Sequence, residues 1–257
     1  MKTLSIVAPL IVFASFLFSA DLAATPMSGD SAIRHGAQKA MKAGNFKDAY
    51  EQFRRLALDP QTNPQQVPGD LDRAIDCLNR LNRATEIDAF REAAIKAHSN
   101  NWRLLQAAAI SYLNGNHTGH LIAGQFERGR HRGGGHVVNA EARDRVRALQ
   151  LMTQAMPLAE QEGTSELVAG RPSNRTTLNQ VSAFFQQFAQ MWLGNRGWRE
   201  AWRLQYLTDL DVLPDYEPGW GGYHAGLRGA PVDEQGNPIF YHVPPSFDAS
   251  ANDGQRW

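Results

Sequence analysis

Residues 127–138 read ERGRHRGGGHVV, so three arginines and two histidines surround three consecutive glycines. Such a segment could bind a phosphate, an RNA backbone or a metal ion, or it could connect two helices. A phosphate-binding loop needs G-x-x-x-x-G-K-[ST], which is absent, and no hydrophobic strand precedes the glycines as a dinucleotide fold would require. We therefore expect a structured connector and docking point, with Arg128, Arg130 and Arg132 as contact residues.

Four histidines near this segment offer a metal-binding alternative. They are His117, His120, His131 and His136, and Glu127 lies between them in the sequence. Imidazoles from nearby loop positions can complete a tetrahedral zinc site, which would make the protein a metal-dependent hydrolase. However, the chain has no H-E-x-x-H motif, and His117 and His120 lack the i,i+4 spacing of helical ligands. The pattern is more typical of polar loop histidines, so we expect no cofactor and no catalytic residues.

Aromatic side chains are dense toward the C-terminus. Trp198, Trp202 and Tyr206 recur every fourth residue, which places them on one face of a predicted helix. If exposed, they would anchor a peptide or make the protein a carbohydrate-binding module. If buried, they would form a local core between the last helices and the following segment. The sequence leaves both interpretations open.

The balance of charges bears on the class of partner. Lys+Arg and Asp+Glu both number 26, so the formal net charge is zero. A dedicated nucleic-acid-binding protein carries a basic excess on its binding face, so we expect no nucleic-acid partner. The chain also lacks a G-x-S-x-G motif and a Cys/His pair that would indicate nucleophilic catalysis. These absences favour a non-enzymatic protein.

The first 24 residues have the pattern of a secretory signal peptide. One basic residue, Lys2, precedes an apolar run over residues 4–18 that is short for a membrane span. Cleavage after Ala24 would give a secreted or periplasmic protein, whereas an uncleaved segment would anchor the protein in a membrane. The only cysteine, Cys77, cannot form an intrachain disulfide, and its place on an apolar helix face indicates a buried small residue.

Two consecutive segments each predict a pair of helices. Apolar residues recur at helical spacing over residues 31–60 and again over residues 71–95, and a third unit begins at Trp102. The first two units align with each other at Phe53 and Phe90 and at Ala37 and Ala74. The pattern resembles a tetratricopeptide repeat. We therefore expect a mainly α fold in which helix–turn–helix pairs stack as a solenoid.

Longer elements follow the predicted pairs. Asn139 is a good N-cap for a helix over residues 139–162, which Pro157 is expected to kink or break. A loop is predicted over residues 163–175, followed by an amphipathic helix over residues 176–193.

The chain changes character at residue 214, where glycine, proline and aromatic residues become frequent. Residues 230–232 and 239–241 flank a Glu-Gln-Gly-Asn turn, which predicts a β-hairpin. The expected organisation is a signal peptide over residues 1–24 and an α-helical repeat domain over residues 25–213. Residues 214–257 are expected to form a linker to a domain outside this chain.

Three stretches resemble the N-terminal region of large alpha-2-macroglobulin-like proteins of planctomycete-type bacteria. They are AMKAGNFKDAYEQFRRLALDP, GQFERGRHRGGGHVVNAEARDRVRALQLMTQAMPLA and GAPVDEQGNPIFYHVPPSFDASANDGQRW. The family contains endopeptidase inhibitors with a bait segment and, often, a Cys-Gln thioester. Cys77 lies in DCLNR and does not match that thioester motif. The resemblance implies an exported, non-catalytic interaction module whose partner is a protein, either the macroglobulin domains of that family or a protease.

Overall fold

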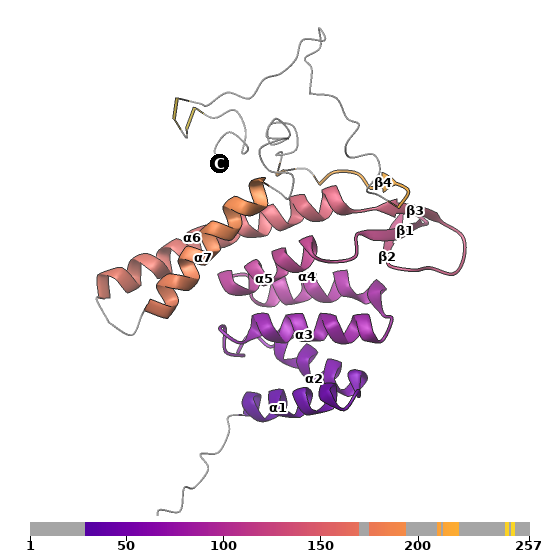
Figure 1. The fold of residues 1–257 in the computed structure, drawn as a ribbon, viewed down its shortest axis with the longest axis horizontal. Coiled ribbons are helices and arrows are strands. Elements are labelled where there is room, and N and C mark those ends of the chain that lie inside the picture. Colours follow the sequence, from indigo (N-terminus) through magenta and orange to yellow (C-terminus); the bar gives the residue numbers. More distant parts are fainter. Residues whose placement is uncertain are drawn as a thin grey trace, which may run out of the picture.

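The structure, a computed structural model, describes residues 29–169, 175–193, 210–211, 213–220, 245–246 and 248–249. Over these residues the protein is mainly helical, with seven α-helices, one 3-10 helix and a four-stranded antiparallel sheet (Figure 1). The mainly α class expected from the sequence is thereby confirmed. The predicted signal peptide and the predicted hairpin over residues 230–241 lie outside the described residues.

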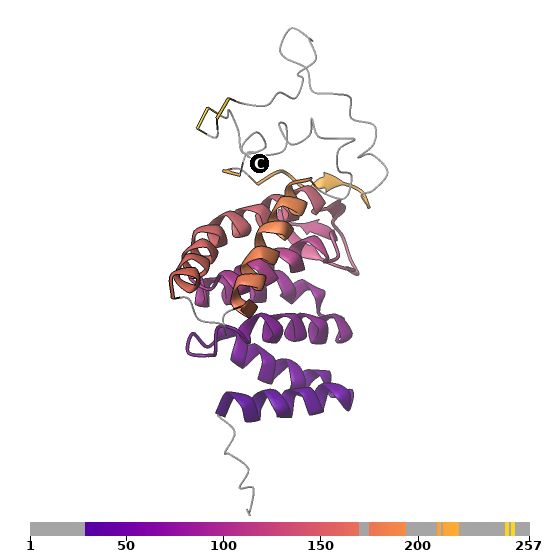
Figure 2. The ribbon, with the colours of Figure 1, turned by 60° about the vertical axis from the view of Figure 1, so that its left-hand side comes forward.

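The N-terminal half is a stack of short amphipathic helices. In chain order these are α1 (Gly29–Lys42), α2 (Phe46–Leu58), α3 (Val67–Arg80), the 3-10 helix η1 (Ala84–Glu86), α4 (Ile87–Ala97) and α5 (Trp102–Leu113). Helix α2 packs between α1 and α3, and α3 in turn packs against α5 (Figures 1 and 2). The apolar stripes meet in one core, in which Phe53, Leu71 and Leu105 are fully buried. Cys77 is also fully buried, which confirms the sequence-based expectation.

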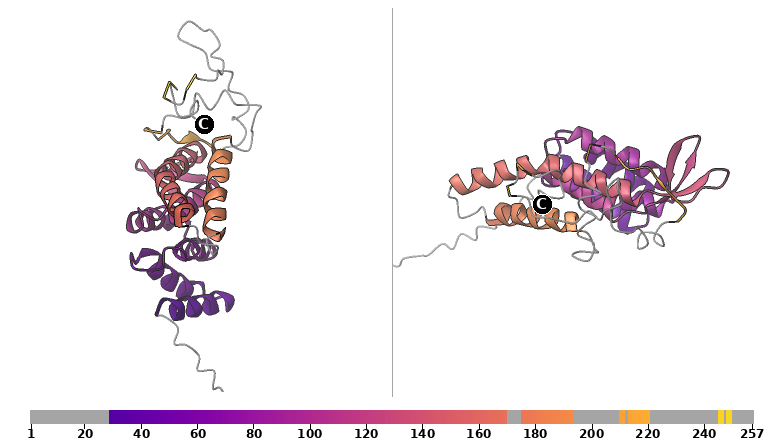
Figure 3. Two further views of the ribbon diagram at one scale, coloured as in Figure 1. Left: turned by 90° about the vertical axis from the view of Figure 1, so that its left-hand side faces the viewer. Right: turned by 90° about the horizontal axis from the view of Figure 1, so that it is seen from above.

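Two long helices close the stack. Helix α6 (Glu141–Ala169) packs along α5, and α7 (Arg175–Leu193) packs against α6 (Figure 3). The side-chain oxygen of Asn139 accepts a hydrogen bond of 2.7 Å from the backbone N–H of Glu141, the first residue of α6. The helix thus begins two residues after the predicted cap, and Asn139 is the last residue of β3. Among the described residues, no helix has the length and hydrophobicity needed to cross a membrane.

The predicted loop over residues 163–175 is wrong for residues 163–169, which continue α6. Pro157 lies inside this helix and does not end it. Gly163 is buried, and a Cβ at this position would stand 3.1 Å from a methyl carbon of Val181 on α7. The glycine therefore permits close contact between the two helices, and it does not act as a helix terminator.

The outer half of α6 is joined to α5 by one carboxylate. Glu162 accepts hydrogen bonds from the indole N–H of Trp102 at 2.7 Å and from Arg103 at 2.8 and 2.7 Å. The hydrogen bonds from Arg103 hold the pKa of Glu162 below its ordinary value. We call this group of three side chains the Glu162 cluster.

Residues 118–139 are not the simple helix connector that was expected, because they contain three strands. The strands are β1 (Thr118–Ile122), β2 (Gln125–Arg128) and β3 (His136–Asn139), and the sheet order is β2-β1-β3-β4, with β4 at Glu217–Pro218. Ile122 pairs with Gln125 across a two-residue turn in which Ala123 and Gly124 have φ of 48° and 79°. Positive φ at both positions is typical of a type I′ hairpin turn.

The glycine-rich loop joins β2 to β3 and needs its glycines at two places. Gly129 has φ of 94°, and a Cβ there would stand 2.9 Å from Cβ of Ala84 on η1. Gly135 has φ of 124°, and its Cβ would stand 2.9 Å from the carbonyl oxygen of Leu121. These two glycines therefore allow the close approach of the loop to η1 and to β1.

Candidate functional site

Arg128 is the centre of a buried charged cluster. The residue is 4% exposed, and its Nε donates to both carboxylate oxygens of Asp88 at 3.0 Å. Its Nη1 and Nη2 donate to the two carboxylate oxygens of Asp144 at 2.8 and 2.9 Å, and Nη1 also donates to the carbonyl oxygen of Asn116 at 2.5 Å. The expectation that Arg128 contacts a partner is therefore corrected: its hydrogen-bonding groups are engaged inside the protein.

The elements around Arg128 explain this arrangement. Arg128 is the last residue of β2, Asp88 lies in the first turn of α4, and Asp144 lies in the first turn of α6. A carboxylate in the first turn of a helix interacts favourably with the helix dipole. Burial alone would raise the pKa of Asp144, but hydrogen bonds from His117 and Arg128 outweigh burial and hold it below its ordinary value.

His117 completes the cluster from the loop before β1. Its Nδ1 lies 2.8 Å from a carboxylate oxygen of Asp144, and its Nε2 lies 3.2 Å from the carbonyl oxygen of Leu113. We call Arg128, Asp88, Asp144 and His117 the Arg128 cluster.

A second chain of contacts connects α4 to α5 and α6. The Tyr112 hydroxyl donates to Glu92 at 2.6 Å, and Glu92 also accepts from Arg147 Nε at 2.8 Å and Nη2 at 2.7 Å. Burial and the hydrogen bond to Glu92 raise the pKa of Tyr112 above its ordinary value. Helix α4 thus contributes charged residues to both sets of contacts.

The four predicted histidines do not converge on one point. His117 belongs to the Arg128 cluster, whereas the ring centroids of His120 and His131 lie 5.7 Å apart beside β2. His131 Nδ1 is 3.4 Å from a carboxylate oxygen of Glu127, and His136 is exposed. Within the described ranges, no group of three or more His, Cys, Asp or Glu side chains is arranged to hold a metal ion.

The other predicted contact residues divide into two groups. Arg130 and Arg132 are exposed on the loop between β2 and β3. Trp198, Trp202 and Tyr206 lie outside the described residues. Nearby, Tyr216 stacks on Phe126 of β2 with ring centroids 4.7 Å apart, which joins the segment before β4 to the sheet.

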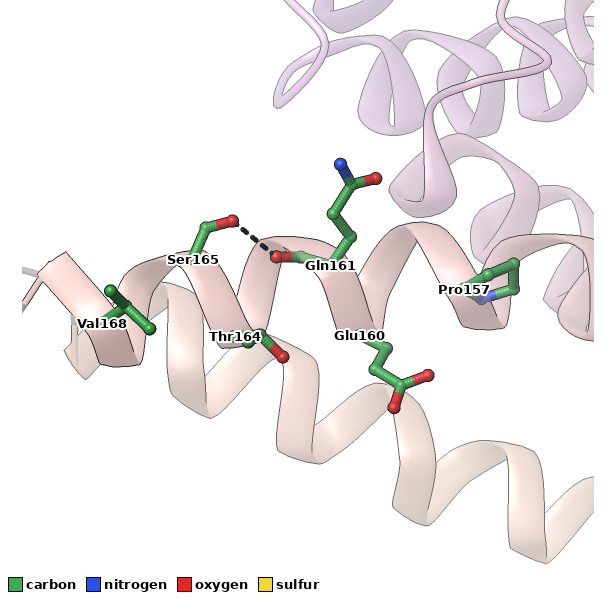
Figure 4. Close-up of a pocket in the computed structure, with 6 residues that line it drawn as sticks. All are labelled: Pro157, Glu160, Gln161, Thr164, Ser165 and Val168. Carbon is green, nitrogen blue, oxygen red and sulfur yellow. Dashed lines mark hydrogen bonds between the residues drawn. The ribbon is translucent and has the colours of Figure 1, made fainter.

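A surface hollow lies along the outer half of α6. All six lining residues come from that one helix, namely Pro157, Glu160, Gln161, Thr164, Ser165 and Val168 (Figure 4). The hydrogen bond drawn in Figure 4 lies within α6, where the Ser165 hydroxyl donates to the Gln161 carbonyl oxygen at 2.7 Å. The hollow therefore brings together no side chains from different elements, and we do not assign it a function.

Comparison with known proteins gives no family. No family model, curated protein or solved structure matches this chain.

Asp88 and Asp144, which determine the environment of Arg128, were not predicted from the sequence. They lie 40 residues before Arg128 and 16 residues after it, and neither belongs to a motif. The only signal near them is the position of Asp144 a few residues after Asn139, the predicted N-cap. The Arg128 cluster neutralises a buried guanidinium and fixes β2 against α4 and α6.

Proposed function

We propose that the protein is an exported, non-catalytic interaction module built from stacked helical pairs. In this proposal the pairs are tetratricopeptide-like, and the module is related to the N-terminal region of alpha-2-macroglobulin-like proteins. Its partner is a protein, either macroglobulin domains or a protease.

The observation that carries the proposal is the equivalent burial of the aligned positions in the first two pairs. Ala37 of α1 and Ala74 of α3 are both fully buried, and Phe53 of α2 and Phe90 of α4 are 0% and 5% exposed. Small residues at the first position and aromatic residues at the second are what repeated packing of similar pairs requires. Stacked pairs expose an extended surface, which suits the binding of a polypeptide.

The surface proposed for contact changes in one respect from the sequence-based expectation. Arg130 and Arg132 remain candidates because they are exposed on the β2–β3 loop, whereas Arg128 is buried in its own cluster. The Trp198, Trp202 and Tyr206 stripe also remains part of the proposal. Arginine and tryptophan are enriched among the residues that dominate binding energy at protein interfaces.

Site-specific photocrosslinking tests this function. In one variant, produced in the source cells, a photoreactive phenylalanine derivative replaces Arg132. In the control variant the same derivative replaces Lys47, which is exposed on α2. We expect a discrete crosslinked protein from position 132 and none of that mass from position 47. Identical products from positions 132 and 47 would argue against a contact surface on this loop. So would the absence of any product both from position 132 and from a second variant with the same probe at Arg130.

Export is tested separately. We expect the N-terminal sequence of the protein recovered from the cell envelope or medium to begin at Thr25, because the predicted cleavage follows Ala24. Recovery of an intact N-terminus from the membrane fraction would instead indicate an anchored protein.

A further inference from the structure

A cavity of about 330 Å³ lies where α3, α4, α5 and β2 meet. This volume is at the lower end of the range of ligand pockets, so the cavity suits a small chemical group. Three isoleucines, Ile75, Ile87 and Ile110, give it apolar walls. Arg91 and Arg128 also line it, so a hydrophobic part and a cationic part face the same space.

The two arginines differ in how well their hydrogen-bond donors are satisfied. Every guanidinium nitrogen of Arg128 donates to Asp88, Asp144 or the Asn116 carbonyl oxygen. Arg91 is 1% exposed, yet its Nη1 is 3.3 Å from a carboxylate oxygen of Asp88 and its Nη2 is 3.3 Å from the Ser111 carbonyl oxygen. Its Nε has no hydrogen-bond partner. A buried donor without a partner is rare in proteins and is costly when no ligand or water satisfies it.

The surroundings of Arg91 hold its guanidinium at the cavity. Its central carbon lies 3.8 Å from the ring centroid of Tyr112, whose own hydroxyl is engaged by Glu92. Gly115 also lines the cavity, and a Cβ there would stand 3.9 Å from Arg91 Nη2. The same Cβ would stand 3.0 Å from the Ser111 carbonyl oxygen, so a side chain at this position would crowd the backbone of α5.

Arg91 is the cationic group of the lining that has a donor without a partner, because Asp88 and Asp144 neutralise Arg128. Asp72 is the carboxylate among the lining residues. Asn79 and Asn114 add amide groups at the wall. A planar guanidinium matches the geometry of a carboxylate, and hydrogen bonds between the two are charge-assisted.

We propose that this cavity binds a carboxylate group, with Arg91 as the residue that receives it and the three isoleucines in contact with the attached alkyl part. The carboxylate belongs either to a small branched organic acid or to the C-terminus of a peptide. The inference goes beyond the proposed function, because it concerns the cavity and does not require the β2–β3 loop to contact a partner.

Calorimetric titration of the full chain with matched probes tests the proposal. One pair is 3-methylbutanoate and 3-methylbutanamide; the other is N-acetyl-Gly-Leu with a free or an amidated C-terminus. We expect saturable binding of at least one acid, and binding of its amide weaker by about tenfold or more, since a hydrogen bond to a charged group is that strong. If N-acetyl-Gly-Leu binds and 3-methylbutanoate does not, the ligand is the C-terminus of a peptide. If 3-methylbutanoate binds as tightly as N-acetyl-Gly-Leu, the small acid is sufficient and the ligand is a small branched acid. No binding of either acid, or equal binding of acid and amide, would overturn the proposal.

Three variants locate the binding. Arg91→Met should weaken binding of the acid by about tenfold or more, because the charged partner is removed. Asn79→Trp fills the cavity from an exposed position, so it should abolish binding even if Arg91→Met does not fold. Asn100→Trp makes the same change at an exposed asparagine away from the cavity and should leave the affinity unchanged. Undiminished binding by Asn79→Trp would show that the acid binds elsewhere.

Discussion

Arg128 and Arg91 line the same cavity but stand in opposite chemical situations. Both are almost fully buried, at 4% and 1% exposed. Arg128 is held by two carboxylates from two helices, whereas Arg91 has two hydrogen bonds of 3.3 Å and one nitrogen without a partner. Arg128, whose partners all lie inside the protein, therefore contributes to the fold. Arg91 has a donor that the proposed carboxylate would satisfy.

The difference depends on where the carboxylates come from. Asp144 enters from α6 and hydrogen-bonds to Arg128, while Asp88 is closer to Arg128, at 3.0 Å, than to Arg91, at 3.3 Å. Arg128 therefore receives most of the negative charge at this junction. Substitutions around Arg128 and around Arg91 should show whether the first stabilises the fold and the second does not.

Substitution of Asp144 by alanine should have the largest effect on stability. It leaves Arg128 buried with Asp88 as its one carboxylate partner and removes the partner of His117. Breaking a buried ion pair by removing one member costs about 3–5 kcal/mol, so we expect a loss of that size in the free energy of unfolding. Urea denaturation followed by circular dichroism measures it.

The matched control for this substitution is Glu160→Ala, which removes an exposed carboxylate from the same helix. An exposed charge contributes little, so the control should change the free energy of unfolding by less than about 0.5 kcal/mol. Similar losses in the two variants would show that the Arg128 cluster is not an anchor of the fold.

Acid should remove part of the Asp144 contribution. The pKa of Asp144 is held below its ordinary value in the folded protein, so this contribution is fully present above the unfolded pKa, about 3.9. It is lost as the pH falls through the folded pKa. We expect the difference in unfolding free energy between the wild type and Asp144→Asn to shrink below about pH 4. A difference independent of pH down to pH 2 would contradict this.

The Glu162 cluster should give the smallest effect, although Glu162 and Asp144 each accept three hydrogen bonds. The Glu162 side chain is 33% exposed, against 5% for Asp144, so solvent screens its charge. We expect Glu162→Gln to cost about 1 kcal/mol in thermal or urea denaturation, because the glutamine oxygen still accepts from Trp102. A loss as large as that of Asp144→Ala would mean that burial does not set the strength of these clusters.

The helices could be predicted from the sequence because their signals are local. Apolar residues at helical spacing predict α1 to α5 and α7, and Asn139, the predicted cap of α6, hydrogen-bonds to the first residue of that helix. Gly163 misled the prediction because glycine usually indicates a break, whereas here it packs against Val181 across a helix interface. That contact joins residues distant in the chain, and local patterns do not report it.

The sheet and the charged cluster could not be predicted for the same reason. Strands β1 to β3 are four or five residues long and β4 has two residues. The β1–β2 turn is Ala-Gly and lacks the Asn-Gly or Asp-Gly signal of a type I′ hairpin. In the sequence, Arg128 lies among charged residues and glycines, which are typical of a surface loop. Its burial depends on Asp88 and Asp144, which approach it from other elements. Long-range charge pairing therefore reversed its predicted role.

The division of roles between the two arginines is tested most directly by comparing Arg128→Met and Arg91→Met in their free energies of unfolding. Arg128→Met leaves Asp144 buried without its arginine, so we expect a loss of about 3–5 kcal/mol. Arg91→Met removes a poorly satisfied charge and its contact with Tyr112, and we expect a change within about 1 kcal/mol of zero. Equal losses in the two variants, or a larger loss for Arg91→Met, would contradict the assignment of one arginine to the fold and the other to a ligand.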